Sequence, residues 1–468
     1  MGLENLVKFK YDVMDKISPT FCAAKWKQVT IHLQNGHTHS CHHPVTHKVP
    51  LEELKENPSA LHNTKHKKML RKMMLEGERP AECDYCWRVE DNNSNSISDR
   101  VFKTADTWSA PYIDDIKNKP WDVDEVPSYL EVSFGNVCNF KCSYCAPHIS
   151  SKWMEEIEAY GAYPTADNFN NIDTLKKQNT LPIPYKDKNP YIDAFWKWWP
   201  AIANKVEHFR ITGGEPLLNK ETYKFLDYII ENPNPNLNLS INANMCPPND
   251  LLNKFIEKVK IIINEKKVKK FKVFTSCEAH GKQAEYIRFG LDYNLWLANI
   301  EKMLKEVPGL GFTIMSTYNA LSIPSYIDFL TDIVRLKKEY WNPKFYTSSP
   351  VLLDIPYLRY PTHQSVFILT EDFVKEVYDQ VTFIYTNLEN KNWQGSAMMG
   401  FHEHEAERMK RIYEMVLTHP KKDNEAYNDY NRKNFRLFVD EHDKRRNTNF
   451  VQTFPQMEEF YKHCGTFL

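Results

Sequence analysis

Three cysteines stand within eight residues of one another, as Cys138, Cys142 and Cys145 in Cys-Asn-Phe-Lys-Cys-Ser-Tyr-Cys. Thiolates at this spacing can converge on one soft metal centre. A [4Fe–4S] cluster held by protein alone takes four cysteines, so three leave one iron open to an outside ligand. Two alternatives remain: a zinc site with His148 as its fourth ligand, or three buried cysteines without a metal.

A glycine pair forms the second chemical signal, in Gly213-Gly214-Glu215-Pro216 after the apolar run His208–Thr212. The chain has only 14 glycines, so an adjacent pair at the end of a predicted strand is informative. Glycines let backbone groups approach a ligand closely, and Glu215 adds an acceptor for an ammonium group. Taken alone, the motif is also explained by a plain turn.

Residues 126–360 contain the elements that must position both motifs, because short apolar runs alternate there with amphipathic stretches. The predicted strands are Tyr129–Phe134, His208–Thr212, Leu237–Asn242, Phe271–Ser276, Gly311–Ser316 and Val351–Ile355. The predicted helices are Phe195–Val206, Lys220–Ile230, Asp250–Ile263, Leu295–Val307 and Ser325–Tyr340. This pattern predicts an α/β fold, a partial (β/α)6 barrel with a parallel sheet. Its working face should lie at the carboxyl ends of the strands, where both motifs fall.

The CxxxCxxC motif, Gly-Gly-Glu-Pro and the six-fold alternation together resemble the radical S-adenosylmethionine (radical SAM) superfamily, over roughly residues 126–355. The resemblance implies that Cys138, Cys142 and Cys145 hold a [4Fe–4S] cluster whose open iron binds SAM. It implies reductive cleavage of SAM to a 5′-deoxyadenosyl radical, which takes a hydrogen atom from a substrate C–H bond. A flavodoxin- or ferredoxin-type protein is the implied electron donor.

The same resemblance implies a set of SAM contacts. It places Tyr144 beside the adenine, and Gly213, Gly214, Glu215 and Pro216 at the methionine amino group. Ser276 and Arg288 match family positions at the end of the fourth strand and just after it, which the resemblance places toward the SAM ribose and carboxylate. By position at strand ends, further candidates are Asn242, Glu278 and Ser316. Polar residues at strand ends are also common turn formers. Cys277, beside Ser276, is a candidate hydrogen or proton donor.

Four more cysteines precede this core, and they are Cys22, Cys41, Cys83 and Cys86. Their order resembles the radical SAM subset with a twitch-type (half-SPASM) auxiliary-cluster domain. In better-known members that domain follows the barrel, whereas here the cysteines come first. The resemblance implies a second [4Fe–4S] cluster. A zinc site remains an alternative, because several histidines crowd Cys41 and imidazole suits zinc; a metal-free region is the other.

The composition and length of the chain bound its organisation and its partners. With 468 residues we expect three parts: an irregular auxiliary-cluster domain at 1–125, the core at 126–360 and a helical C-terminal region at 361–468. A net charge of −1 gives no reason to expect a nucleic-acid partner. No apolar run is long enough to suggest a membrane span, and no signal sequence suggests secretion. We therefore expect a cytoplasmic protein. The basic run Lys65–Lys72 predicts a solvated helix face.

These features predict a radical SAM enzyme with two iron–sulfur clusters. Modification of a peptide or protein ranks first. Oxidation or rearrangement of a small sugar- or nucleotide-like molecule ranks second. An interpretation of another class is a zinc- or cluster-binding structural protein that does not cleave SAM.

Overall fold

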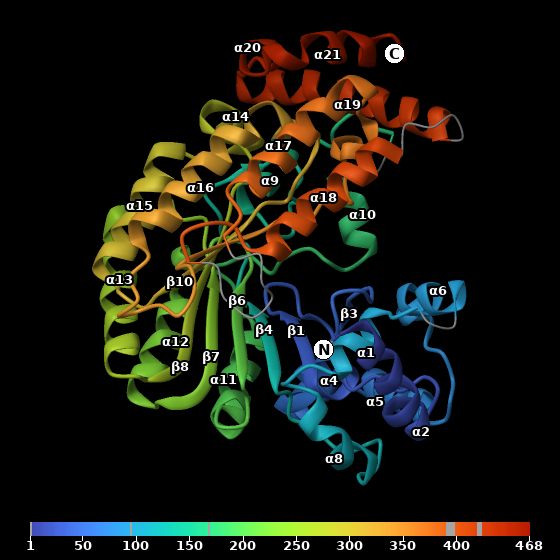
Figure 1. Ribbon diagram of the computed structural model, residues 1–468. Helices are drawn as coiled ribbons and strands as arrows, with labels where there is room; N and C mark the ends of the chain where they lie inside the picture. The colour runs from blue at the N-terminus through green and yellow to red at the C-terminus, as the bar shows by residue number, and fades with distance from the viewer. Residues whose placement is uncertain (1, 94–95, 167–168, 390–397, 419–423) are drawn as a thin grey trace.

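A nine-stranded sheet forms the centre of this computed structural model, which describes residues 2–93, 96–166, 169–389, 398–418 and 424–468 (Figure 1). The strand order is β11-β10-β8-β7-β6-β4-β1-β2-β3. The strands are β1 (Gln28–His32), β2 (His37–His39), β3 (His47–Lys48), β4 (Tyr129–Ser133), β6 (His208–Thr212), β7 (Asn234–Asn242), β8 (Val268–Ser276), β10 (Gly311–Met315) and β11 (Val351–Asp354).

The six core strands, from β4 to β11, are mutually parallel, as the alternating pattern predicts. The sheet stays open between its edge strands, so the barrel is partial. The strand predicted at His208–Thr212 matches β6, whereas β7 and β8 each begin three residues earlier than predicted, at Asn234 and Val268.

The sheet continues past the boundary predicted near residue 125. Strand β1 pairs in parallel with β4, with Thr30 opposite Glu131, and β2 and β3 extend the sheet as antiparallel strands. The N-terminal region is therefore less irregular than its composition suggests. The alternating stretch that begins at Gln28 forms β1, which is buried on both faces from Gln28 to Ile31 and pairs with the core sheet. The division into three domains stays a prediction.

Helices cover one face of the core sheet. They are α11 (Pro190–Ile202), α12 (Lys220–Glu231), α13 (Asn249–Asn264), α15 (Tyr293–Glu306) and α16 (Tyr326–Tyr340). The short α14 (Gly281–Ile287) packs against α15 beyond the strand ends. Trp199 of α11 packs edge-on against Phe209 of β6. Helix α11 begins before the predicted Phe195, because the Asn189 side chain accepts hydrogen bonds from two N–H groups of its first turn. The other face of the sheet carries half-buried polar residues, among them Glu131 and Arg210.

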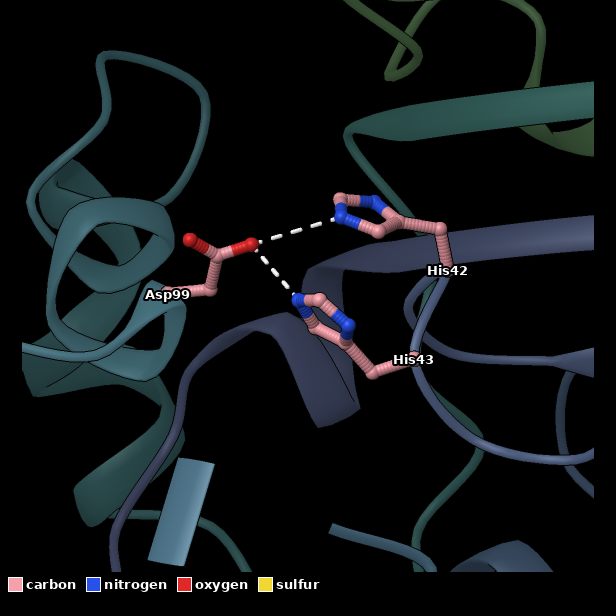
Figure 2. Close-up of side chains that lie close together, drawn as sticks. All are labelled: His42, His43 and Asp99. Carbon is pink, nitrogen blue, oxygen red and sulfur yellow. Dashed lines mark hydrogen bonds and ion pairs between the residues drawn. The ribbon is translucent and has the colours of Figure 1, made fainter. Parts of the chain in front are cut away.

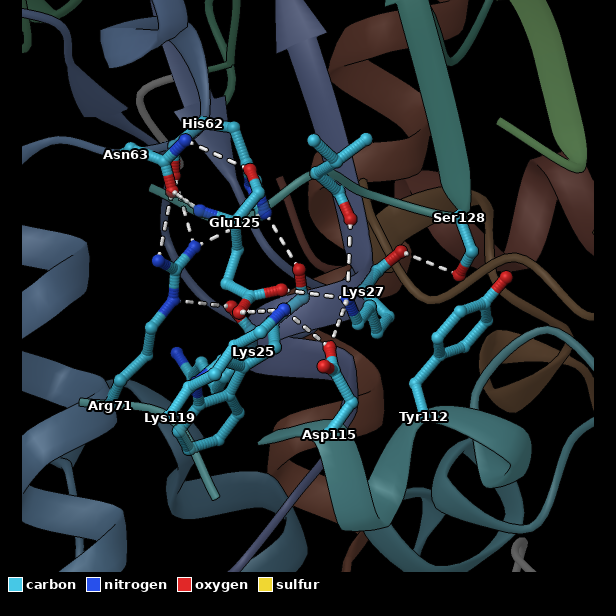
Figure 3. A network of polar contacts seen from close by, with 12 residues as sticks. Lys25, Lys27, His62, Asn63, Arg71, Tyr112, Asp115, Lys119, Glu125 and Ser128 are labelled. Atoms are coloured by element: carbon cyan, nitrogen blue, oxygen red, sulfur yellow. Dashed lines mark hydrogen bonds and ion pairs between the residues drawn. The ribbon is translucent and has the colours of Figure 1, made fainter. Parts of the chain in front are cut away.

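The N-terminal helices pack beside β1. They are α1 (Leu3–Phe9), α2 (Asp15–Ile17), α3 (Ala24–Lys27), α4 (Leu51–Glu56), α5 (Lys65–Leu75), α6 (Asp84–Asn92), α7 (Asp99–Thr104) and α8 (Ile113–Lys117). The expectation of a solvated face on α5 is wrong for Lys67 and Arg71, which are buried. Arg71 donates to the Asn63 side chain (2.9 Å), and Asn63 in turn bonds the backbone of Glu125 (Figure 3). These bonds fix the segment that leads into β4.

The C-terminal helices gather at one end of the molecule, beyond the ends of the core strands (Figure 1). They are α17 (Val374–Thr386), α18 (Glu403–Thr418), α19 (Glu425–Arg446), α20 (Phe450–Thr453) and α21 (Glu458–Gly465). The helical character predicted for the C-terminal region is confirmed, and the region includes the 22-residue α19. Four short elements complete the core: β5 (Lys141–Cys142), β9 (Arg288–Phe289), α9 (Ser151–Tyr160) and α10 (Ile172–Lys177). Among the described residues, none of the helices has the length and apolar character that a membrane crossing requires.

Candidate active site

The loop after β4 carries Cys138, Cys142 and Cys145, and a second segment holds it in place. Strand β5, inside the loop, pairs antiparallel with β9, so that Cys142 lies opposite Arg288. The N–H of Ser143 also donates to the carbonyl of Ile287 (2.7 Å). The spacing of the cysteines is local, but their presentation depends on a strand more than 140 residues away.

The three thiols of this loop are free, and those of Cys142 and Cys145 lie near the charge of Arg288. Burial raises the pKa of all three thiols, that of Cys145 to about 12, while the nearby charge of Arg288 acts in the opposite direction on Cys142 and Cys145. None of the three is in a disulfide. Thiols with such pKa values stay protonated near neutral pH unless a metal cation replaces the proton. Three free thiols on one loop are the donor set that the predicted cluster requires, provided that the metal displaces their protons.

The two glycines of the Gly-Gly-Glu-Pro motif pack against this same loop. A Cβ on Gly214 would lie 2.3 Å from the carbonyl oxygen of Val137, and Gly213 has φ of +119°, a conformation that favours glycine. The N–H of Gly214 donates to the Gly135 carbonyl (3.0 Å). Glycine is thus required here by the contact between two loops.

Glu215 is buried and turned toward backbone donors. Its carboxylate accepts hydrogen bonds from the N–H groups of Leu217 (2.9 Å) and Asn244 (2.5 Å). Burial raises the pKa of Glu215 to about 7, although these two bonds lower it. Pro216 begins the short 3-10 turn that follows. The predicted role of Glu215 toward an ammonium group stays a prediction.

Three other predicted residues come together beside the cysteine loop. Arg288 donates from Nε to Glu278 (2.9 Å), bonds the hydroxyl of Tyr144, and places Nη1 3.6 Å from the Cys142 sulfur. Burial raises the pKa of Glu278, and the charge of Arg288 opposes that shift. The second carboxylate oxygen of Glu278 is buried without a partner among the described residues.

The remaining predicted residues lie at strand ends in different surroundings. Asn242 accepts a hydrogen bond from Arg210 Nε (2.9 Å), and Ser276 is half-buried beside Met315. Ser316 is buried and accepts from the hydroxyl of Tyr326 (3.0 Å). Cys277 is buried, directs its thiol at the Ala279 carbonyl, and is outside the lining of the cavity described next. Its role as a hydrogen donor stays a prediction.

A cavity of about 770 Å³ lies on the polar face of the sheet. Gly213, Asn242 and Met315 line it at the carboxyl ends of the core strands. His39, His42 and Lys103 line it from the N-terminal region. The cavity therefore extends from the glycine motif toward the second set of cysteines.

Those four cysteines, Cys22, Cys41, Cys83 and Cys86, line one small pocket, although they come from three separate segments. All are free thiols, and burial raises the pKa of Cys83 to about 12 and of Cys86 to about 11. The same pocket is lined by two buried cations, Lys25 and Arg100, each ion-paired with a glutamate. A four-thiolate set in an apolar pocket beside cations fits a negatively charged [4Fe–4S] cluster, and it also fits zinc.

Sequence analysis missed two arginines of this region. Arg210 lines the cavity; the alternation of His208, Arg210 and Thr212 with apolar neighbours in β6 could have placed it on the polar face. Arg446, the last residue of α19, donates to the Lys141 carbonyl in the cysteine loop (2.7 Å). It also pairs with buried Glu156 (3.1 Å). No local signal links residues so far apart in the chain.

An open, mostly parallel sheet with a loop of three free cysteines at its carboxyl edge makes this an α/β protein with a candidate metal centre. The family comparison is specific: residues 132–330 match the family model described as Radical SAM superfamily, and the chain contains a radical SAM domain. A domain of this family implies a [4Fe–4S] cluster and SAM as cofactors.

Several proteins of known name are similar to parts of this chain. It is 28% identical over 121 residues to a GTP 3′,8-cyclase of Sulfurimonas denitrificans, a match covering 26% of this chain and 28% of the cyclase. It is 30% identical over 106 residues to that of Campylobacter lari, covering 23% and 24%. The chain thus spans about a quarter of the length of these curated relatives.

Two solved structures are also similar. Streptococcus suis SuiB bound to S-adenosylmethionine gives a TM-score of 0.33 at 13% identity, covering 77% of this chain and 70% of that one. The FeFe-hydrogenase maturase HydG from Carboxydothermus hydrogenoformans gives 0.29 at 12% identity, covering 100% and 99%.

Proposed function

We propose that this chain is a radical SAM enzyme that removes a hydrogen atom from a C–H bond of a polar substrate held in the cavity. The observation that carries the proposal is the composition of the cavity wall. Gly213 lines one part, and Lys103, which also lines the N-terminal cysteine pocket, lines another. A substrate in this space would lie between the two cysteine sites.

The two sets of cysteines divide the cofactor binding. Cys138, Cys142 and Cys145 would hold the SAM-binding [4Fe–4S] cluster, and the N-terminal set of four would hold a second cluster. With SAM bound, the first cluster supplies a 5′-deoxyadenosyl radical by reductive cleavage. The second would serve electron transfer, because four cysteines leave no iron open. The chain's own side chains would bind and orient the substrate.

The cavity wall supports a small sugar- or nucleotide-like substrate, which reverses the order suggested by the sequence. Arg210 is fixed by Asn242 and stacks 4.2 Å from the ring centroid of Phe274. Lys103 adds a second positive group, and Trp108 and Tyr129 offer aromatic faces. A volume of about 770 Å³ suits one small molecule. The names of the GTP 3′,8-cyclases agree with this substrate class.

Peptide or protein modification is the second candidate, and one observation favours it. Phe102 lines the cavity and is 48% exposed, so an apolar surface stands at the edge of a polar site. Such a residue can pack against a side chain of a larger substrate whose remainder stays outside. In either case we propose a cytoplasmic enzyme that takes electrons from a flavodoxin- or ferredoxin-type protein.

The test is anaerobic reconstitution followed by SAM cleavage under dithionite. Iron, sulfide and zinc are counted first, and 5′-deoxyadenosine is then measured without substrate, with a panel of nucleotides and sugars, and with short peptides. We expect a member of the first panel to increase 5′-deoxyadenosine formation. Arg210→Ala should reduce that increase, whereas Lys270→Ala, at an exposed position of β8, should leave it unchanged. A chain with full iron that forms no 5′-deoxyadenosine would instead be the structural protein of the third interpretation.

A further inference from the structure

Two histidines and an aspartate converge between the cavity and the N-terminal cysteine pocket. His42 and His43 follow Cys41, and Asp99 begins α7. Figure 2 shows both imidazoles directed at the same carboxylate oxygen. The His43 Nε2 atom lies 2.6 Å from Asp99 Oδ2, and His42 Nε2 lies 3.3 Å from it. The three ligand atoms are all within 4.8 Å of one another.

The 3.3 Å separation is that of ligands sharing one metal ion, whereas the 2.6 Å contact is a hydrogen bond that the ion would replace. With metal–ligand bonds of about 2.0–2.2 Å, neighbouring ligand atoms in a tetrahedral site lie roughly 3.3 Å apart. Two imidazoles and one carboxylate form a donor set typical of divalent first-row transition metals. An ion could therefore enter between the three side chains with small shifts of their rings.

An ion bound by these three residues would lie between the cavity and the cysteine pocket. His42 and Asp99 line the substrate cavity, while His43 lines the cysteine pocket. The His43 ring is held by stacking on Tyr85, with ring centroids 3.9 Å apart. His42 is 59% exposed, so an ion can reach the site from solvent. Three protein ligands leave coordination positions free, as catalytic rather than structural sites do.

We propose that His42, His43 and Asp99 bind one divalent transition-metal ion, separate from both cysteine sets. Its free positions take an oxygen donor from the molecule in the cavity; this last part rests on the proposed function, whereas metal binding itself does not. The site differs from a zinc knuckle around Cys41, because its third ligand is a carboxylate from another helix.

The experiment uses Mn²⁺ as probe on the reconstituted chain, because Mn²⁺ prefers oxygen and nitrogen donors and competes poorly for thiolates. Free Mn²⁺ is followed by electron paramagnetic resonance after treatment with a mild chelator. We expect one tight equivalent per chain. His42→Ala, Asp99→Ala and the nearly isosteric Asp99→Asn should each weaken it at least about tenfold. His66→Ala is the matched control, since His66 also pairs with a carboxylate, Glu82 at 3.3 Å, but without a third ligand.

Iron and sulfide content provide the second readout. They should be unchanged in the His42 and Asp99 variants. Equal Mn²⁺ affinity in these variants and the wild type would overturn the proposal. A loss of about four irons on replacing His42 or Asp99 would also overturn it, because the residues would then belong to the cluster site. Absence of SAM cleavage would contradict the proposed function and leave the Mn²⁺ result standing.

Discussion

The two cysteine sites of this molecule are built in opposite ways. The core site takes three cysteines from one short loop, and distant segments only hold that loop in position. The N-terminal site takes its four cysteines from three segments that span residues 22 to 86, and the fold itself brings them together. The first set has one cysteine fewer than the four that hold a [4Fe–4S] cluster, and the second set has four.

This difference predicts that substitutions in the two sets of cysteines have different effects. A three-ligand site leaves room for a reactant, so its loss should remove chemistry while leaving the fold intact. A four-ligand site joins separate segments, so its metal should contribute to folding as well as to electron transfer. Each of the following substitutions tests this difference between the two sets of cysteines.

The largest effect is expected in the core loop. Cys138→Ala, Cys142→Ala and Cys145→Ala should each abolish SAM cleavage, because each removes one of only three thiolates. The measurement is 5′-deoxyadenosine formed under dithionite. Cys464→Ala is a matched control at a buried cysteine outside both sites, and it should retain cleavage. Substantial cleavage in any of the three loop variants would contradict the assignment of the core site.

A smaller effect is expected at Arg446, which supports the core loop from the C-terminal region. Burial acts to raise the pKa of Glu156, but the charge of Arg446 and the hydrogen bonds around it hold that pKa at about 2. Arg446→Met would leave Glu156 with Lys141 and the hydroxyl of Tyr163, and it would remove the bond to the Lys141 carbonyl. We expect a stability loss of about 3 kcal/mol and a fall in SAM cleavage of roughly 10-fold.

Thermal unfolding and 5′-deoxyadenosine formation measure these two losses. Lys444→Met, on the same helix with a side chain 79% exposed, is the control and should change neither. A variant that unfolds at the wild-type temperature and cleaves SAM at the wild-type rate would show that the loop does not depend on α19.

The contrast between the sites also explains what the sequence could predict. The CxxxCxxC motif is local in sequence, so the cysteine loop could be predicted. The polar and apolar residues of His208–Thr212 alternate with a period of two, so the strand could be predicted as well. The four N-terminal cysteines were recognisable by type, but the packing of three separate segments into one pocket was not. Arg446 and Asp99 carry no local pattern that marks a site. Arg446 is 305 residues from its partner Lys141, and Asp99 is more than 50 residues from His42 and His43. Only tertiary packing brings these residues together.

The next prediction concerns the N-terminal site. Cys83→Ala combined with Cys86→Ala should remove about four irons per chain but leave SAM cleavage without substrate measurable, since the core loop is intact. The double variant should also unfold at a lower temperature than wild type, because its metal no longer joins the three segments. Iron content, 5′-deoxyadenosine and thermal unfolding are measured on the same sample. Unchanged iron would remove the second cluster, and a loss of one zinc instead would make the site structural.

The smallest effect is a pH dependence at Glu215, beside the core loop. Its pKa is raised by burial from an ordinary 4.5 to about 7, so the folded chain binds this proton more tightly than the unfolded chain. The stability that the neutral carboxyl contributes is therefore present below pH 4.5 and is lost as the pH rises to about 7. The shift corresponds to at most about 3 kcal/mol.

Glu215→Gln removes the titration while keeping the shape of the side chain. The difference in unfolding temperature between wild type and this variant should therefore change between pH 5 and pH 8. The unfolding temperature of the wild type should fall relative to that of the variant as the pH rises. Glu257→Gln, at an exposed position of α13, controls for the loss of one carboxylate. A pH-independent difference would mean that Glu215 is already ionised at pH 5 in the folded chain. The two backbone N–H groups that it accepts from would then outweigh its burial, and the core loop would rest on a fixed negative charge.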